Sequence, residues 1–254
     1  MDVATPTLTH EVFGAATAHG DRPALVDLHG GRVYGYRRLA AEVAAAASGL
    51  VRRGARPDQV VGVLAGNATT QTLAVHTAIA AGGIAAPIDP RLPVEEVVRL
   101  LRSWDARTLF VTQDLAPAAL RAADASRVRQ VVCFGPADGT LDFAELLALA
   151  PVALPEVDPR GQVAMVLRDG VAVTHAGMLA RMAELDRPVG LDASDVVLAT
   201  CPIDAALATL GCLVLARGAM LVGACPVATA DPAGTCQDFG VTVTASGDGP
   251  PRRV

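Results

Sequence analysis

The sequence contains no lysine, and all 21 of its basic residues are arginine. It therefore has no side-chain amine that could form a Schiff base, act as an amine base or place a compact charge on a phosphate. Phe, Trp and Tyr make up only 3% of the chain, so rings on which bases or sugars could stack are scarce. The five cysteines are an odd number without a Cys-x-x-Cys pair, which predicts reduced thiols, a cytoplasmic location and no metal site.

Charge and apolar runs exclude further classes of protein. The net charge is −5 and the arginines form no basic stripe, which argues against a nucleic-acid partner. Charged residues, glycine or proline interrupt every apolar run before roughly 18 residues, so no membrane span is expected. The N-terminus lacks a charged start followed by an apolar core, so it is not interpreted as a signal peptide. With 52% hydrophobic and 19% charged residues, the chain is expected to be globular.

Apolar runs alternate with amphipathic segments along the whole chain. Strands are predicted at 32–36, 60–64, 84–88, 108–112, 128–134, 163–167, 171–175, 195–199, 219–222 and 241–244. Helices are predicted at 36–53, 69–81, 93–104, 116–123, 143–149, 176–187, 204–216 and 231–239. This alternation predicts an α/β fold of doubly wound, mostly parallel sheets with helices on both faces. The Pro-containing stretch 151–161 is the predicted linker, and the turn-rich tail 246–254 is expected to fray.

The predicted strands 163–167 and 171–175 are joined by only Arg168, Asp169 and Gly170. An Asp-Gly pair between two such runs is typical of a tight turn, because glycine tolerates positive φ. The sequence therefore predicts a plain turn at this join, with too few backbone amides to hold several phosphates. Arg168 is interpreted either as a solvated turn charge or as a contact to a single anion.

Seven segments carry a family resemblance that extends over nearly the whole chain: 21–27 (DRPALVD), 34–54, 82–93 (GGIAAPIDPRLP), 170–178 (GVAVTHAGM), 192–198 (DASDVVL), 217–222 (RGAMLV) and 239–244 (FGVTVT). In this order they resemble the large N-terminal domain of the adenylate-forming (ANL) superfamily, which includes acyl-CoA synthetases, nonribosomal peptide adenylation domains and luciferases. The resemblance implies that residues 1–254 form a truncated N-terminal domain of this type. It also implies two subdomains, one of residues 57–175 and one of residues 1–56 with 176–254.

Two parts of the family's machinery have no counterpart in this sequence. In the family, a loop of the type S-G-T-T-G-x-P-K-G follows the strand that corresponds to 163–167, and its amides, hydroxyls and lysine hold the ATP phosphates. The C-terminal half of the family, which carries a catalytic lysine, is not matched either. The resemblance therefore implies a chain that does not adenylate, needs no cofactor and binds a small acyl or carboxylate ligand. An exposed sheet edge after 241–244 implies a homodimer or a pathway protein partner.

The first candidate site segment is the Thr-His pair at 174–175, which in the family lies beside the nucleotide and starts a helix. Thr174 is interpreted as a helix cap or a ligand contact. His175 is either a satisfied polar residue at the helix start or a catalytic group.

The second candidate segment is the run Cys201-Pro202-Ile203-Asp204, where relatives carry proline, an aromatic residue and His or Asp at the border of the acyl or aminoacyl pocket. Pro202 and Ile203 are therefore candidate ligand contacts. Asp204 is either a helix cap or, by resemblance, the residue that holds an amino acid's ammonium group. Cys201 is either a nucleophile or a small buried residue.

Three functional hypotheses remain open from the sequence. The first is a degenerate, non-adenylating homologue that binds a small molecule or docks a partner, in a setting such as natural-product biosynthesis. The second is an enzyme repurposed for ATP-independent chemistry on an acyl or carbonyl substrate, with His175, Asp204 and Cys201 as its catalytic candidates. The third is one half of a split acyl-activating ligase that another chain completes, or a gene remnant, and it requires a large apolar surface where the other half would dock.

Overall fold

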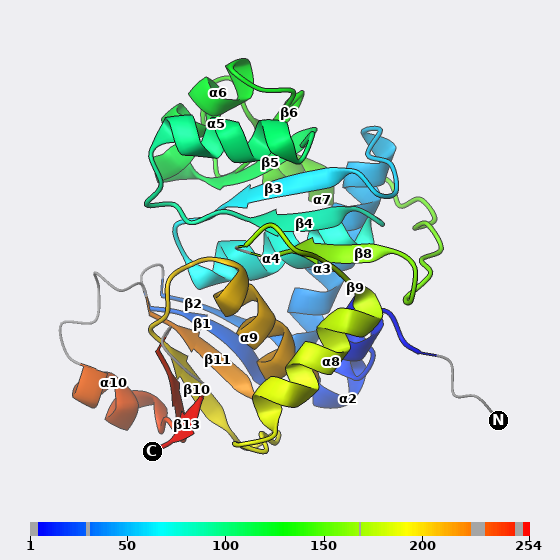
Figure 1. Cartoon of the computed structure of the whole chain (residues 1–254). Helices are drawn as coiled ribbons and strands as arrows, with labels where there is room; N and C mark the ends of the chain where they lie inside the picture. The colour runs from blue at the N-terminus through cyan, green and yellow to red at the C-terminus, as the bar shows by residue number, and fades with distance from the viewer. Residues whose placement is uncertain (1–4, 29–30, 168, 225–231, 247–250) are drawn as a thin grey trace.

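The computed structural model describes residues 5–28, 31–167, 169–224, 232–246 and 251–254. Within these residues the strands form one sheet of seven and one of six, with helices between the sheets and over their outer faces (Figure 1). No helix in these ranges combines the length and the apolar character that crossing a bilayer requires.

The seven-stranded sheet is built from the middle of the chain. Its spatial order is β7 (Leu141–Asp142), β6 (Gln130–Phe134), β5 (Thr108–Thr112), β3 (Val60–Leu64), β4 (Ile84–Pro87), β8 (Val163–Val166) and β9 (Ala172–Thr174). Every neighbouring pair is parallel except β8 with β9, which form an antiparallel hairpin. The hairpin therefore ends the parallel order at one edge of the sheet.

The six-stranded sheet combines strands from both ends of the chain. Its order is β13 (Arg252–Arg253), β12 (Val243–Ala245), β10 (Val196–Ala199), β11 (Met220–Gly223), β1 (Pro23–Asp27) and β2 (Arg32–Gly35). The four central strands are parallel and the two outer strands are antiparallel to their neighbours. The predicted α/β fold of mostly parallel sheets is confirmed, whereas the division into subdomains at 57 and 175 stays a prediction.

Helices separate the molecule into layers. The outer face of the seven-stranded sheet is covered by α5 (Val94–Ser103) and α6 (Ala116–Asp124), and α10 (Pro232–Phe239) packs on the outer face of the six-stranded sheet. The layer between the sheets contains α3 (Tyr36–Arg52), α4 (Ala68–Ala80), α8 (His175–Asp186) and α9 (Ala205–Ala216). Shorter helices are α1 (Leu8–Phe13), α2 (Ala16–His19), α7 (Phe143–Leu147) and the 3-10 turn Gln113–Leu115.

The strand β5 illustrates why both faces of the sheet are covered. Leu109 and Val111 belong to the apolar cluster under α5 and α6, whereas Phe110 belongs to the central cluster between the sheets. Alternate residues of a strand point to opposite faces, so an uninterrupted apolar run requires apolar partners on both sides. The continuous runs in the sequence therefore predicted the layers correctly.

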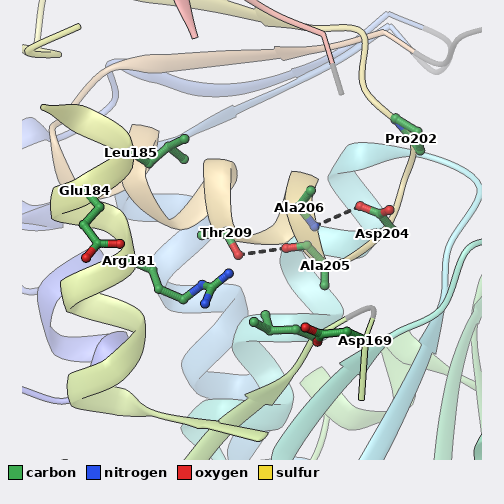
Figure 2. Close-up of a pocket in the computed structure, with 10 residues that line it drawn as sticks. Asp169, Arg181, Glu184, Leu185, Pro202, Asp204, Ala205, Ala206 and Thr209 are labelled. Atoms are coloured by element: carbon green, nitrogen blue, oxygen red, sulfur yellow. Dashed lines mark hydrogen bonds between the residues drawn. The ribbon is translucent and has the colours of Figure 1, made fainter. Parts of the chain in front are cut away.

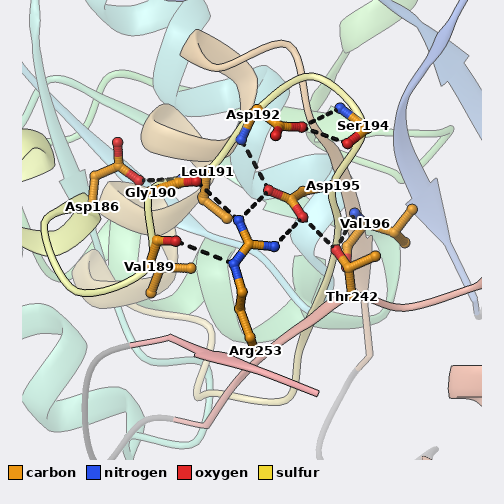
Figure 3. A network of polar contacts seen from close by, with 10 residues as sticks. All are labelled: Asp186, Val189, Gly190, Leu191, Asp192, Ser194, Asp195, Val196, Thr242 and Arg253. Atoms are coloured by element: carbon orange, nitrogen blue, oxygen red, sulfur yellow. Dashed lines mark hydrogen bonds and ion pairs between the residues drawn. The ribbon is translucent and has the colours of Figure 1, made fainter.

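Residues 251–254, the end of the tail that was expected to fray, correct the sequence prediction, whereas 247–250 lie outside the described residues. Instead of fraying, residues 252 and 253 pair with β12, and Arg253 forms an ion pair with the carboxylate of Asp195 (Figure 3). Its two terminal nitrogens lie 2.8 and 3.1 Å from the two carboxylate oxygens, and the hydroxyl of Thr242 donates to Asp195 Oδ1 at 2.7 Å. Burial alone would raise the pKa of Asp195, whose side chain is 3% exposed, but these hydrogen bonds hold it below the usual value. The bidentate pair fixes the tail on the edge of the sheet.

Candidate functional site

A pocket of about 750 Å³ lies between α8, the first turn of α9 and the end of the β8–β9 hairpin, and we name it the α8–α9 pocket (Figure 2). Its lining residues are Leu167, Asp169, Arg181, Glu184, Leu185, Pro202, Asp204, Ala205, Ala206 and Thr209. A volume in this range suits a small organic ligand. The carboxyl end of β8 points toward it, as expected for ligand sites in open α/β sheets.

The hairpin turn at one wall of the pocket uses its own backbone donors. Gly170, at a φ of 81°, donates its N–H to the carbonyl of Leu167 at 2.8 Å, and the Leu167 N–H donates to the carbonyl of Val171 at 2.9 Å. The Val171 N–H donates to Asp169 Oδ1 at 3.1 Å. The tight turn was predicted from the Asp-Gly pair and is present. Arg168, the anion contact considered from the sequence, lies outside the described residues.

Asp204 is both a helix cap and a wall of the pocket. Its Oδ1 accepts the N–H of Ala206 at 2.8 Å, and its backbone carbonyl accepts the side-chain amide of Gln71 at 2.9 Å. The residue is 4% exposed. A carboxylate at a helix N-terminus is stabilised by the backbone donors and by the helix dipole. The predicted cap is confirmed, and a ligand contact at the same residue stays a prediction.

The other residues of the 201–204 run divide between the pocket and the core. Pro202 is half-buried and lines the pocket, whereas Ile203 is buried in the central cluster. Cys201 is 4% exposed, and burial raises the pKa of its thiol to about 11. A thiol with a raised pKa carries little thiolate at neutral pH, so this environment favours the small buried residue over the nucleophile.

The Thr-His pair faces a different part of the molecule. Thr174 caps α8, because its hydroxyl accepts the N–H of Gly177 at 3.1 Å. His175 is 2% exposed, and its Nδ1 accepts the N–H of Leu8 in α1 at 3.1 Å. Burial lowers the pKa of His175 and keeps its ring neutral, as the acceptor role at Nδ1 requires. His175 lines a smaller cavity of about 370 Å³ under α1, so the structure does not bring His175 and Asp204 into one pocket.

Charged residues of α8 complete the α8–α9 pocket, and the sequence analysis did not select them. Figure 2 shows Arg181 reaching from α8 toward α9, with Glu184 one turn further along the same helix. Both side chains are exposed, and no hydrogen bond or ion pair of Arg181 is found within the described part of the chain. Their spacing of three residues places them on one helix face beside Leu185. This spacing was the signal by which the sequence could have identified them.

Groups that could hold a metal are not gathered here. Among residues 5–28, 31–167, 169–224, 232–246 and 251–254, no cluster of three or more His, Cys, Asp or Glu side chains has metal-binding geometry. The α8–α9 pocket instead combines one guanidinium with three carboxylates, those of Asp169, Glu184 and Asp204. Such a set can hold a ligand that carries both charges, and it can exchange protons only through carboxylates.

Comparison with known sequences places the chain in a family. A sequence model described as AMP-binding enzyme matches residues 12–167. A probable non-canonical nonribosomal peptide synthetase, CymA, of Salinispora arenicola is 37% identical over 100 residues, which cover 39% of this chain and 1% of that synthetase.

Solved structures extend the likeness to nearly the full chain. A long-chain-fatty-acid-CoA ligase, FadD1, of Archaeoglobus fulgidus superposes with a TM-score of 0.84 at 19% identity, covering 96% of this chain and 53% of that one. The anthranilate CoA ligase AuaEII, solved with anthranoyl-AMP, gives a TM-score of 0.83 at 19% identity, with 95% of this chain and 50% of that one covered. The chain thus spans about half the length of these ligases. Because the family model covers more than half of the sequence, this chain belongs to the AMP-binding enzyme family.

Proposed function

We propose that this chain binds a small amino acid or related carboxylate in the α8–α9 pocket and does not adenylate it. The observation that carries the proposal is the hairpin between Leu167 and Val171, in which the N–H groups of Leu167, Gly170 and Val171 are bonded within the turn. A site for ATP phosphates needs free N–H groups and positive charge at this position. The turn instead presents the Asp169 carboxylate to the pocket, which would repel a phosphate.

The extent of the family match supports the same conclusion. The match to the AMP-binding enzyme model ends at Leu167, one residue before the shortened turn. The sequence match therefore stops where the family's phosphate-binding loop would begin, although the structural likeness continues over nearly the whole chain.

The charges of the pocket favour a ligand with a carboxylate and an ammonium group. Arg181 offers the planar fork of donors that pairs with a carboxylate in two hydrogen bonds. Asp204, by its resemblance to the family's aminoacyl pocket, would hold the ammonium group. The likeness to a nonribosomal peptide synthetase supports an amino acid more than a fatty acyl chain.

The repurposed-enzyme hypothesis has weaker support. Cys201 is a buried thiol whose pKa is raised by burial and also by the charge of Asp204, and His175 lines another cavity, so neither is suited to act with Asp204 in catalysis. The split-ligase hypothesis requires a large apolar docking surface. Within the described ranges, the exposed large hydrophobic residues are scattered over β2, the linker, the hairpin and the C-terminus: Val33, Leu154, Val171 and Val254.

Partner and location complete the proposal. The homodimer rested on an uncovered sheet edge after β12, and β13 pairs along that edge, which weakens its physical basis. A pathway protein that receives the bound ligand, and a cytoplasmic setting in keeping with reduced cysteines, remain part of the proposal.

Two assays test this function. ATP–pyrophosphate exchange with amino, aryl and acyl acids should stay at background, and robust exchange with any acid would overturn the non-adenylating assignment. Calorimetry with a panel of amino acids should find a ligand whose affinity falls about tenfold or more in Arg181→Gln, because a bidentate charged contact is lost. The matched control is Arg187→Gln, since Arg187 is exposed at the end of the same helix and does not line the pocket. Equal losses in both variants would contradict the proposed site.

A further inference from the structure

Four arginines line a second surface pocket at the amino-terminal ends of β3, β5 and β6 in the seven-stranded sheet. The pocket measures about 720 Å³, and we name it the arginine pocket. Its charged residues are Arg53, Arg56, Arg107 and Arg129, and the amide side chains of Gln59 and Gln130 also line it. No aspartate, glutamate or aromatic residue is among its described lining residues. A single sign of charge therefore dominates this site in a chain whose net charge is −5.

The sheet itself brings these arginines together. The strands β3, β5 and β6 are parallel neighbours, so the residues that precede them lie close together at the amino-terminal end of the strands. The Arg107 N–H donates to the carbonyl of Val60 at 3.2 Å, and the Arg129 N–H donates to the carbonyl of Arg107 at 2.8 Å. These bonds continue the sheet register by one residue. Arg107 and Arg129 are therefore held side by side by the backbone.

The end of α3 supplies the other two arginines. Arg53 caps the C-terminus of this helix, and Gly54 at a φ of 95° turns the chain back toward β3. The short connection that follows places Arg56 at the same amino-terminal end of the strands, where its backbone N–H donates to Gln59 Oε1 at 3.1 Å. The backbone positions of Arg107 and Arg129 thus follow from the sheet, and those of Arg53 and Arg56 from the helix end and the short connection after it.

Countercharge at the arginine pocket is scarce. The nearby carboxylate of Asp105 pairs with Arg107 at 2.7 Å and also with Arg127 at 3.0 Å, and these two arginines lower its pKa. Within the described part of the chain, the side chains of Arg53, Arg56 and Arg129 have no ion pair or hydrogen bond. Like charges on neighbouring strands destabilise a sheet. A bound anion would therefore reduce the repulsion between these arginines.

We propose that the arginine pocket binds a small molecule with two or three linked phosphate groups. Guanidinium groups match phosphate oxygens in bidentate pairs, and several groups at fixed positions favour a ligand with several anionic centres. The volume admits more than one phosphate and lies in the range of small-molecule sites. The lining has no ring on which a base could stack, so recognition is directed at the phosphates, whether they come from an inorganic polyphosphate or from a nucleotide.

Calorimetry on the full chain tests this site with tripolyphosphate, pyrophosphate, ADP and sulfate. Tripolyphosphate should bind with one-to-one stoichiometry and about tenfold or more tighter than sulfate, because it engages more arginines at once. ADP that binds tighter than pyrophosphate would identify a nucleotide as the source, whereas the reverse order would identify an inorganic phosphate. Sulfate that binds as tightly as tripolyphosphate would overturn the proposal.

The double variant Arg56→Gln with Arg129→Gln should weaken tripolyphosphate binding about tenfold or more. Its melting temperature without ligand should equal or exceed that of the wild type, because repulsion between arginines is relieved, and this separates lost binding from lost folding. The matched control is Arg121→Gln in α6, an exposed arginine outside the pocket. The proposal fails if the control loses as much affinity, if the double variant loses none, or if an oligonucleotide binds more tightly than tripolyphosphate through the same arginines.

Discussion

The helices α8 and α9 lie side by side and begin with the same kind of side-chain cap, but their first residues face different surroundings (Figure 1). Thr174 caps α8 and Asp204 caps α9, each by accepting a backbone N–H of the first turn. At α8 the next residue, His175, accepts a hydrogen bond from Leu8 of α1, whereas at α9 the cap residue itself lines the α8–α9 pocket. Both caps satisfy free backbone donors, so the surroundings of a helix start, rather than its capping chemistry, decide whether it can meet a ligand.

Replacing Asp204 should give the largest effect and should separate its two roles. Asp204→Ala removes both the cap and the charge, so it should lower ligand affinity by about 2 to 5 kcal/mol and the free energy of unfolding by about 1 kcal/mol. Asp204→Asn keeps an effective cap but removes the charge, so it should reproduce the loss of affinity with little loss of stability. Calorimetry and chemical denaturation measure the two quantities.

An unchanged affinity in Asp204→Asn would contradict the ligand role. In that case Asp204 would act only as a cap, and the two helix starts would be equivalent. The comparison would then rest on His175 alone.

At the other helix start, His175→Ala should affect stability rather than binding. The change leaves the Leu8 N–H without its acceptor and removes a buried ring, so the free energy of unfolding should fall by about 2 to 4 kcal/mol. Affinity for a ligand of the α8–α9 pocket should be unchanged, because His175 does not line it. Denaturant unfolding and calorimetry give the two values. A large loss of affinity at unchanged stability would instead support the catalytic or binding role that the sequence left open.

A smaller effect should appear in the pH dependence of stability. Burial lowers the pKa of His175, so the folded chain resists a proton that the unfolded chain accepts near pH about 6.5. The unfolded state then binds more protons, and the free energy of unfolding falls as the pH drops below that value toward the folded pKa. His76, whose pKa burial lowers to about 4, acts in the same direction. Between pH 7 and pH 5, His175→Ala should therefore lose less stability than the wild type, and identical pH profiles would count against a neutral, buried His175.

The sequence predicted the layers of the fold better than it predicted the roles of single residues. Continuous apolar runs such as 60–64 and 108–112 are local signals, and the structure forms strands over the same residues. Leu167, at the end of the predicted strand 163–167, and Pro202, in the second candidate segment, line one pocket, whereas Thr174 and His175 do not. The strands and layers could be predicted because the period of the apolar residues and the order of the strands can be read directly from the sequence.

Other features depend on contacts between distant residues. The direction of His175 is set by α1, a six-residue helix too short to give a clear periodic signal. The order of residues 252 and 253 depends on the contact between Arg253 and Asp195, which lie 58 positions apart in the sequence. Arg181 was missed because a charged residue on an amphipathic helix is usually solvated, and only the position of α9 makes its face part of a pocket.

The contact between Leu8 and His175 also bears on how the chain is made. The two residues are 167 positions apart, and α1 packs against α8 and α9 as well as α4, so its docking surface is complete only after α8 and α9 have been synthesised. At about 5 to 20 residues per second, α1 leaves the ribosome on the order of ten seconds before its partners. The strand β1 is synthesised even longer before β11, its parallel neighbour in the six-stranded sheet. The seven-stranded sheet can form first, while the apolar side chains of Leu8 and Val12 stay accessible to chaperones until the second half of the chain arrives.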